Sequence, residues 1–202
     1  MSFITSPFIQ FPTIVTRRLR LRLFRPEDCQ AIFAYKNRTE KTYFPRIEYH
    51  KDISESQFYI AQCLGKYYSR TGIYWAITQI PDDVVIGSVA LCAMHGDSVI
   101  EYRAEISCSL SIDFRRKGIM TEARIAVINY AFNNWSSLNR IHSEIARENE
   151  PSYKMNLKLG FTEEGLLHSY QRGNDGKFSD IYMLSLLRCD WKVTPIYHNK
   201  EK

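Results

Sequence analysis

The chain has 202 residues and a mass of 23.7 kDa, the size of one globular domain or of two small ones. Hydrophobic residues at 45% and charged residues at 24% match soluble globular proteins, which excludes a disordered, collagen-like or coiled-coil chain. The net charge of +5 lies entirely in the first quarter: residues 1–50 carry nine Lys or Arg and four Asp or Glu, whereas 51–202 carry eighteen of each. Such an excess makes nucleic acid, a membrane surface or an acidic protein candidate partners.

No repeat, low-complexity tract or linker divides the chain, so we expect an N-terminal arm over 1–15, one domain over 16–190 and a tail over 191–202. Over 18–23, leucine alternates with arginine, a period-2 pattern that predicts a half-buried strand with its arginines facing outward. Pro26-Glu27-Asp28 then opens a helix, because proline suits the first turn and acidic residues suit the positive end of the helix dipole.

The rest of the chain alternates between apolar runs of strand length and stretches with helical spacing. Further helices are predicted at about 52–69, over 118–133 and over 151–159, the last ending at Gly160. Further strands are predicted at 74–77, 84–93, 104–112, 141–146, 161–167 and 181–187. This order predicts a mixed α/β sheet with helices on both faces.

The number and spacing of the cysteines indicate the redox compartment of the protein and whether cysteines bind a metal. Cys29, Cys63, Cys92, Cys108 and Cys189 are odd in number, widely spaced and contain no Cys-x-x-Cys pair, which argues against structural disulfides and a zinc knuckle. No secretion signal and no apolar run near 20 residues is present. We therefore expect a cytoplasmic protein with reduced thiols, no membrane partner and no bound metal, and we expect Cys108 to be a small core residue.

The most informative stretch, Arg115-Arg116-Lys117-Gly118-Ile119-Met120-Thr121-Glu122-Ala123, lies where a predicted strand ends and a helix begins. The first turn of a helix offers unpaired backbone N–H groups and the positive end of its dipole, and Gly118 lets the backbone approach a ligand closely. With the charge of the adjacent basic side chains, these features predict a pyrophosphate cradle. The alternative is a solvated helix start with an ordinary glycine.

This stretch resembles the Q/R-x-x-G-x-G/A acetyl-CoA motif of the GNAT acetyltransferase superfamily, with Arg115 and Gly118 in its first two fixed positions. Met120 departs from the commoner glycine or alanine, and the run Gly-x-Met-Thr-Glu-Ala is similar to the ribosomal-protein N-acetyltransferase (RimJ/RimL-like) branch. The segment 149–152, Asn-Glu-Pro-Ser, followed by Gly160-Phe161, resembles that branch's N-x-x-S…GF segment, whose Asn and Ser lie beside the thiol end of coenzyme A.

Two further segments resemble the family. Residues 16–22 look like its opening strand and residues 176–182 like its closing segment, so the resemblance covers about residues 15–188. It implies a single-domain GNAT-like α/β (α+β) fold with a mixed, mostly antiparallel sheet of about seven strands and helices on both faces. It also implies acetyl-CoA as cosubstrate, held by Leu110, Ile112, Arg115, Arg116, Lys117, Gly118, Ile119, Met120, Thr121, Asn149, Ser152 and Asn156.

Catalytic roles follow from the same resemblance. Glu105 aligns with the glutamate that serves as general base in some members, the alternative being an ion pair with Arg103 or Lys117. The strand that holds Leu110 and Ile112 usually carries a bulge and splays from its neighbour, which frees backbone N–H groups for the thioester.

The residue that donates a proton to the leaving CoA thiolate is less obvious from the sequence. Many members use a Tyr seven residues after the motif's Asn, where this chain has Asn156. In the RimL-like branch the serine that matches Ser152 has this role, the alternative being a helix cap, and Asn156 could hold the sulfur or a water molecule.

We therefore expect an acetyl-CoA-dependent N-acetyltransferase that transfers the acetyl group directly to a primary amine. The acceptor that the resemblance favours is a protein N-terminal α-amino group, as in the ribosomal-protein type. The alternatives are acetylation of a small amine, such as a polyamine, aminoglycoside or amino-acid-like metabolite, and an inactive CoA- or RNA-binding module. Otherwise we expect no nucleic-acid partner, and the chain could be a monomer or a homodimer. A solvated face accounts for the strand arginines, whereas a second basic group near the acceptor side could steer an acidic substrate: Lys36, Arg38, Lys41 and Arg46.

Overall fold

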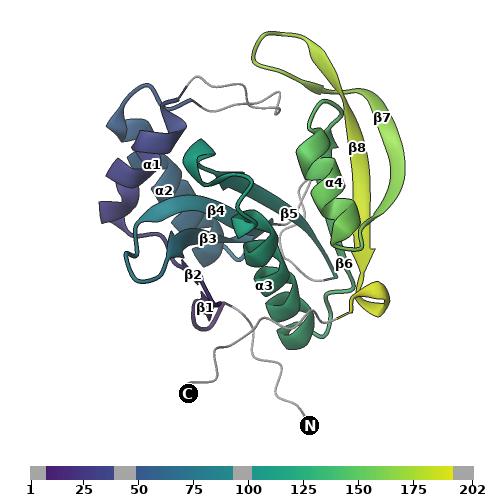
Figure 1. Ribbon diagram of the computed structural model, residues 1–202, viewed down its shortest axis with the longest axis horizontal. Helices are drawn as coiled ribbons and strands as arrows, with labels where there is room; N and C mark the ends of the chain where they lie inside the picture. The colour runs from purple at the N-terminus through teal and green to yellow at the C-terminus, as the bar shows by residue number, and fades with distance from the viewer. Residues whose placement is uncertain (1–7, 39–48, 93–101, 193–202) are drawn as a thin grey trace.

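Helices and strands follow one another along the chain in the predicted order (Figure 1). The computed structural model describes residues 8–38, 49–92 and 102–192. Its strands are β1 (Ile14–Val15), β2 (Leu19–Arg22), β3 (Gly72–Gln79), β4 (Val85–Cys92), β5 (Arg103–Leu110), β6 (Arg140–Ala146), β7 (Thr162–Arg172) and β8 (Phe178–Leu187). Its α-helices are α1 (Cys29–Lys36), α2 (Ile53–Tyr68), α3 (Ile119–Asn134) and α4 (Glu150–Lys158), and 3-10 helices cover Pro26–Asp28, Ile112–Phe114 and Arg188–Asp190.

The described strands form one open sheet in the order β1-β2-β3-β4-β5-β6-β8-β7, in which β5 and β6 pair in parallel and all other neighbours antiparallel. The mixed, mostly antiparallel sheet is confirmed, with one strand more than the expected seven. The additional strand is β1, which pairs with β2 at the end of the predicted arm. Trp75 Nε1 also donates to Pro12 O at 2.6 Å, which ties this segment to the core.

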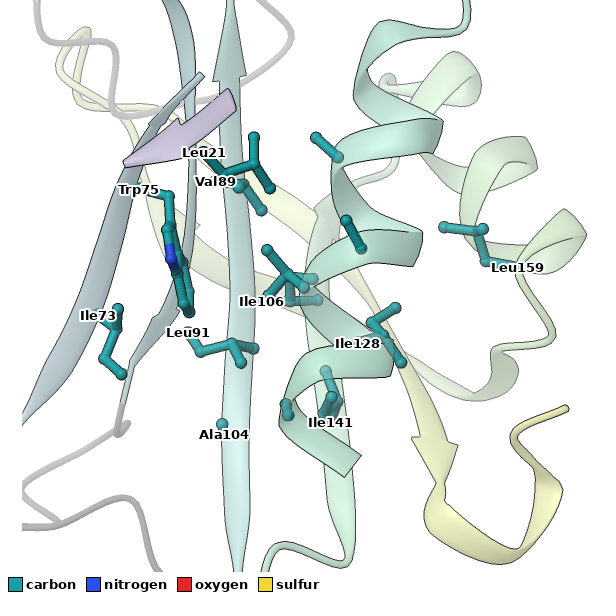
Figure 2. Packing of buried hydrophobic residues seen from close by; sticks show 14 of the residues in the cluster. Leu21, Ile73, Trp75, Val89, Leu91, Ala104, Ile106, Ile128, Ile141 and Leu159 are labelled. Atoms are coloured by element: carbon teal, nitrogen blue, oxygen red, sulfur yellow. The ribbon is translucent and has the colours of Figure 1, made fainter. Parts of the chain in front are cut away.

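Successive side chains of β3 face opposite layers of helices. Trp75 and Ile77 pack in one core cluster with Val127 of α3, whereas Ala76 packs in a second cluster with Ile32 of α1. Figure 2 shows the α3 side, where buried side chains of the strands lie against that helix. Helices therefore cover both faces of the sheet, as predicted, because the period of two in the strands divides the apolar residues between the faces.

One arginine that the sequence pattern predicts to face outward from the first strand is buried. Arg22 is only 4% exposed, with Nη1 2.8 Å from Asp28 Oδ2 and Nε 3.0 Å from Asp83 Oδ1. The prediction is wrong at Arg22 because the 3-10 helix with Asp28 and the β3–β4 turn with Asp83 cover this part of the strand. Arg18 and Arg20 keep 43% and 38% of their side chains exposed.

The helix ends follow local rules. Asp52 caps α2 by accepting hydrogen bonds from the backbone N–H groups of Ser54 and Glu55. Gly160 follows α4 with a φ of +88°, the left-handed conformation that favours glycine at this position, as predicted. Within the described ranges, no helix has both the length and the apolar character needed to cross a bilayer.

Candidate active site

The sheet opens between β5 and β6. The two strands pair at three positions, the last joining Glu105 to His142, although β5 continues to Leu110 and β6 to Ala146. Beyond that pair β5 stays in register with β4, and β6 stays in register with β8. Each strand therefore turns one edge toward a gap in the sheet, which we call the β5–β6 opening.

The β5 edge of this opening carries backbone hydrogen-bond donors. Ser111 N donates to Ile86 O of β4 at 2.9 Å. Because N–H groups alternate between the two edges of a strand, those of Ile106, Cys108 and Leu110 point the other way, toward β6. The Ile106 N–H belongs to the last pairing of β5 with β6, so the N–H groups of Cys108 and Leu110 face the opening. Of these two donors, Leu110 was expected to serve the thioester, whereas Cys108 was expected to be a core residue.

β5 ends earlier than predicted and lacks the expected bulge. Ile112 begins a 3-10 helix instead of continuing the strand. β4 and β5 pair without a register shift from Glu105 to Leu110. The donors are exposed by the divergence of β5 from β6, a long-range feature that the local pattern of residues does not encode.

The loop from β5 into α3 has the geometry of an anion cradle. Arg116 and Gly118 adopt left-handed backbone conformations, with φ of 60° and 72°, which turn neighbouring N–H groups toward one concave side. The helical ladder begins where Glu122 N donates to Gly118 O at 3.0 Å, so the N–H groups of residues 119–121 precede it. Arg115 Nε donates to Leu110 O at 3.2 Å, which joins the cradle to the end of β5.

The segment 16–18, between β1 and β2, holds this cradle in place. Arg18 Nη2 lies 2.6 Å from Glu122 Oε2, and Arg18 Nη1 donates to Lys117 O at 3.0 Å. Thr16 Oγ1 donates to the other oxygen of the same carboxylate at 2.6 Å. Two segments that resemble family motifs and lie about a hundred residues apart in the sequence are therefore in direct contact. The sequence patterns did not predict the ion pair of Arg18 with Glu122, although both residues lie inside those segments.

Glu105 lies where β5 and β6 part. Its neighbours Ala104 and Ile106 belong to the core beneath α3, so the half-buried Glu105 side chain faces the α1–α2 side of the sheet. Its Oε2 lies 3.7 Å from Cys92 Sγ. Burial, and next the Glu105 charge, raise the pKa of the Cys92 thiol to about 12, so this thiol stays protonated. A carboxylate placed here can accept a proton from an amine that approaches from the α1–α2 side.

The start of α4 brings together the second group of predicted residues. Asn149 is the N-cap, and its Oδ1 accepts a hydrogen bond from Ser152 N at 3.2 Å, so the capping side chain is that of Asn149 and not that of Ser152. Asn156 is fully buried, and its Nδ2 donates to Ser152 O at 2.8 Å. Its Oδ1 accepts from Arg124 Nη2 at 2.6 Å. Asn156 is thus committed to contacts within the protein.

Arg124 is a site residue that sequence reasoning missed. It lies on α3 and is 1% exposed, and its guanidinium carbon lies 5.4 Å from the centre of the Phe161 ring. Its Nε has no hydrogen-bond partner among the described residues. Burial lowers the pKa of this guanidinium, and the nearby Cys108 thiol partly offsets that effect. The only signal in the sequence was a basic residue directly beside the buried Ala123.

One cysteine differs from expectation, and the structure places two of the four basic residues near α1. Cys108 is exposed and not a core residue, because it lies on the part of β5 that has left β6. Lys36 Nζ lies 4.1 Å from the centre of an α2 tyrosine ring, and Arg38 pairs with Asp113 at 2.9 Å. Lys41 and Arg46 lie outside the described residues. Among the described residues, no three His, Cys, Asp or Glu side chains are grouped to hold a metal ion.

Comparisons with known proteins identify the family. Residues 18–162 match the model of the acetyltransferase (GNAT) domain. The uncharacterised N-acetyltransferase p20 of Bacillus licheniformis is 31% identical over 179 residues, 89% of this chain and 98% of that protein.

Two solved structures share the fold. The ribosomal-protein-S5-alanine acetyltransferase of Vibrio fischeri has a TM-score of 0.74 at 23% identity, covering 90% of this chain and 99% of that one. The microcin C7 self-immunity acetyltransferase MccE, solved with acetyl-CoA and AMP, has a TM-score of 0.73 at 20% identity, covering 85% and 93%.

Proposed function

Because this chain belongs to the GNAT acetyltransferase family, we propose that it transfers the acetyl group of acetyl-CoA directly to the α-amino group of a protein N-terminus. The observation that carries the proposal is the β5–β6 opening. It joins the Glu105 carboxylate on the α1–α2 face to the cradle and the start of α4 on the opposite face. Acceptor and donor can then meet inside the sheet, each arriving from its own side.

The residues at the opening suit acetyl-CoA, which supplies the acetyl group as an activated thioester. The cradle over 115–121 offers basic side chains and backbone N–H groups to the pyrophosphate. The N–H groups of Cys108 and Leu110 offer hydrogen bonds to the pantetheine arm and to the thioester oxygen. We place Asn149 and Ser152 beside the sulfur, with the Ser152 hydroxyl as a hydrogen-bond donor to it.

An α-amino acceptor matches the weak base that the site provides. Removing the proton from an α-amino group, with a pKa of about 7.7–8.0, costs about 1.0–1.4 kcal/mol at pH 7, whereas a lysine with a pKa of about 10.4 costs roughly 4.6 kcal/mol. A single carboxylate such as Glu105, acting directly or through a water molecule, is sufficient for the first of these tasks.

The ribosomal character of the acceptor rests on two similarities. One is the Gly-x-Met-Thr-Glu-Ala run at the start of α3, and the other is the fold shared with the Vibrio fischeri enzyme named for alanine acetylation of ribosomal protein S5. We place the reaction in the cytoplasm, where the thiols of the five cysteines stay reduced.

The test is a CoA-release assay with acetyl-CoA and a panel of ribosomal-protein N-terminal peptides. The matched control is the same set with each N-terminus chemically blocked. Release with the free peptides and none with the blocked ones supports the proposal. If CoA is released only with polyamines, aminoglycosides or amino-acid-like amines, the acceptor is a small molecule and not a protein.

A further inference from the structure

A buried cation without a carboxylate partner lies beside the β5–β6 opening. Arg124 is 1% exposed, and among the described residues its contacts are the Asn156 amide, the Phe161 ring and the Cys108 thiol. Its Nε has no hydrogen-bond partner there. Arginine stays protonated in proteins, so this side chain carries a full positive charge, and no carboxylate of the described residues pairs with it.

The contacts of Arg124 locate this charge between the elements that border the opening. Cys108 belongs to the free part of β5, whereas Asn156 belongs to α4 and Phe161 follows that helix. Asn156 in turn donates to the backbone of Ser152, the residue placed beside the sulfur of acetyl-CoA. The guanidinium therefore lies on the donor side of the opening, opposite Glu105.

A buried charge with no fixed counter-ion is costly for the folded protein, and packing alone would favour an apolar side chain at this position. The arrangement is advantageous when a negative charge appears at the site only during the reaction. In acetyl transfer from a thioester that charge develops on sulfur.

We propose that Arg124 stabilises the CoA thiolate as it leaves, an inference that rests on the acetyl transfer proposed above. In that step the amine nitrogen bonds to the acetyl carbon and the C–S bond breaks. The electron pair of that bond remains on sulfur, and the amine proton passes to Glu105. Arg124 holds the thiolate until a proton from solvent, passed through the Ser152 hydroxyl, neutralises it. Positive charge near a thiol favours its thiolate form.

The test measures the thiol of bound CoA and needs no acceptor. Thiolate absorbance is followed against pH for the protein saturated with CoA, with the protein saturated with desulfo-CoA as the reference for its own cysteines. We expect the pKa of the bound thiol to lie about one unit or more below that of free CoA. Arg124→Met should remove this shift, Arg124→Lys should restore part of it, and neither should change the affinity for desulfo-CoA by more than about twofold.

Two results overturn the inference. One is a bound thiol in the wild-type protein with the same pKa as free CoA, which decides the question even if Arg124→Met fails to fold. The other is an equal loss of affinity for CoA and desulfo-CoA in Arg124→Met, which would assign the residue to packing. If the thiol shift is found but no peptide is acetylated, the proposed acceptor fails and the role of Arg124 stands.

Discussion

Asp83, in the turn between β3 and β4, gathers positive charge from several arginines. Arg22, Arg20 and Arg25 reach its carboxylate at 3.0, 3.3 and 3.1 Å, and Thr78 Oγ1 donates to it at 2.9 Å. Burial acts to raise the pKa of the Asp83 carboxyl, but hydrogen bonds from Arg22 and Thr78 and the charge of Arg22 outweigh burial and lower the pKa to about 2. Part of the basic surplus is therefore balanced within the fold.

Asp83→Asn should destabilise the protein in a pH-dependent way. The folded-state pKa of about 2 lies below the ordinary value of 3.8, so the carboxylate stabilises the fold above about pH 4 and this stabilisation is lost as the pH falls toward 2. We expect the free energy of unfolding in urea to drop by about 2 kcal/mol at neutral pH, and by much less near pH 2.

The matched control for this variant is Asp82→Asn, at the exposed neighbour in the same turn, which should change stability by less than about 0.5 kcal/mol. An equal loss for Asp83→Asn at both pH values would show that the charge of Asp83 does not stabilise the fold.

Glu105→Gln tests the base. Removing the proton acceptor should lower kcat/KM for a peptide by about 100-fold at neutral pH, and by progressively less at higher pH where the α-amino group is already neutral. Glu27→Gln, on the exposed first 3-10 helix, is the control and should match wild type. A pH–rate profile identical to that of wild type would remove Glu105 from this role.

At the scale of elements, the cradle contains one glycine in a left-handed conformation, beside the left-handed Arg116. Gly118 has a φ of +72°, and a Cβ there would meet Arg18 Nη2 at 3.6 Å. Gly176, in the β7–β8 turn, is a close match, with a φ of +81° and a Cβ contact of 3.7 Å to Arg172 Nη2. Both positions therefore impose similar strain on any other residue, but only Gly118 faces the proposed pyrophosphate.

Gly118→Ala and Gly176→Ala should each cost about 1 kcal/mol of stability. Gly118→Ala should also weaken acetyl-CoA binding, measured by titration calorimetry, by about tenfold or more, because it removes the left-handed turn that aims the N–H groups. Gly176→Ala should bind as wild type does. Equal affinities in the two variants would show that the loop does not hold the ligand.

The elements that the sequence predicted well are those with a strong local period. Alternation predicted β2, and helical spacing that ends at Gly160 placed α4 within one residue at each end. The β5–β6 opening could not be predicted from residues alone, because strand pairing depends on partners far away in the chain. The same limit explains Arg22, whose strand face is covered by a distant turn, and Arg124, whose partners lie on β5 and α4.

At the scale of the whole molecule, acetyl-CoA should bind only the folded state. At a ligand concentration of about 100 times Kd, the folded state gains about 2.7 kcal/mol, which corresponds to a rise in Tm of roughly 5–10 °C for a domain of this size. Differential scanning fluorimetry measures this shift, and Gly118→Ala should reduce it. A shift with RNA and none with acetyl-CoA would favour a binding module over an enzyme.

The α1–α2 face and the α3–α4 face have separate tasks in this account, with the acceptor on the first and acetyl-CoA on the second. The most direct test is mass spectrometry of a peptide that carries a free N-terminal alanine and one internal lysine, after reaction with acetyl-CoA. We expect one acetyl group on the α-amino nitrogen and none on the lysine. Acetylation of the lysine alone, or of neither nitrogen while a small amine is acetylated, would contradict it.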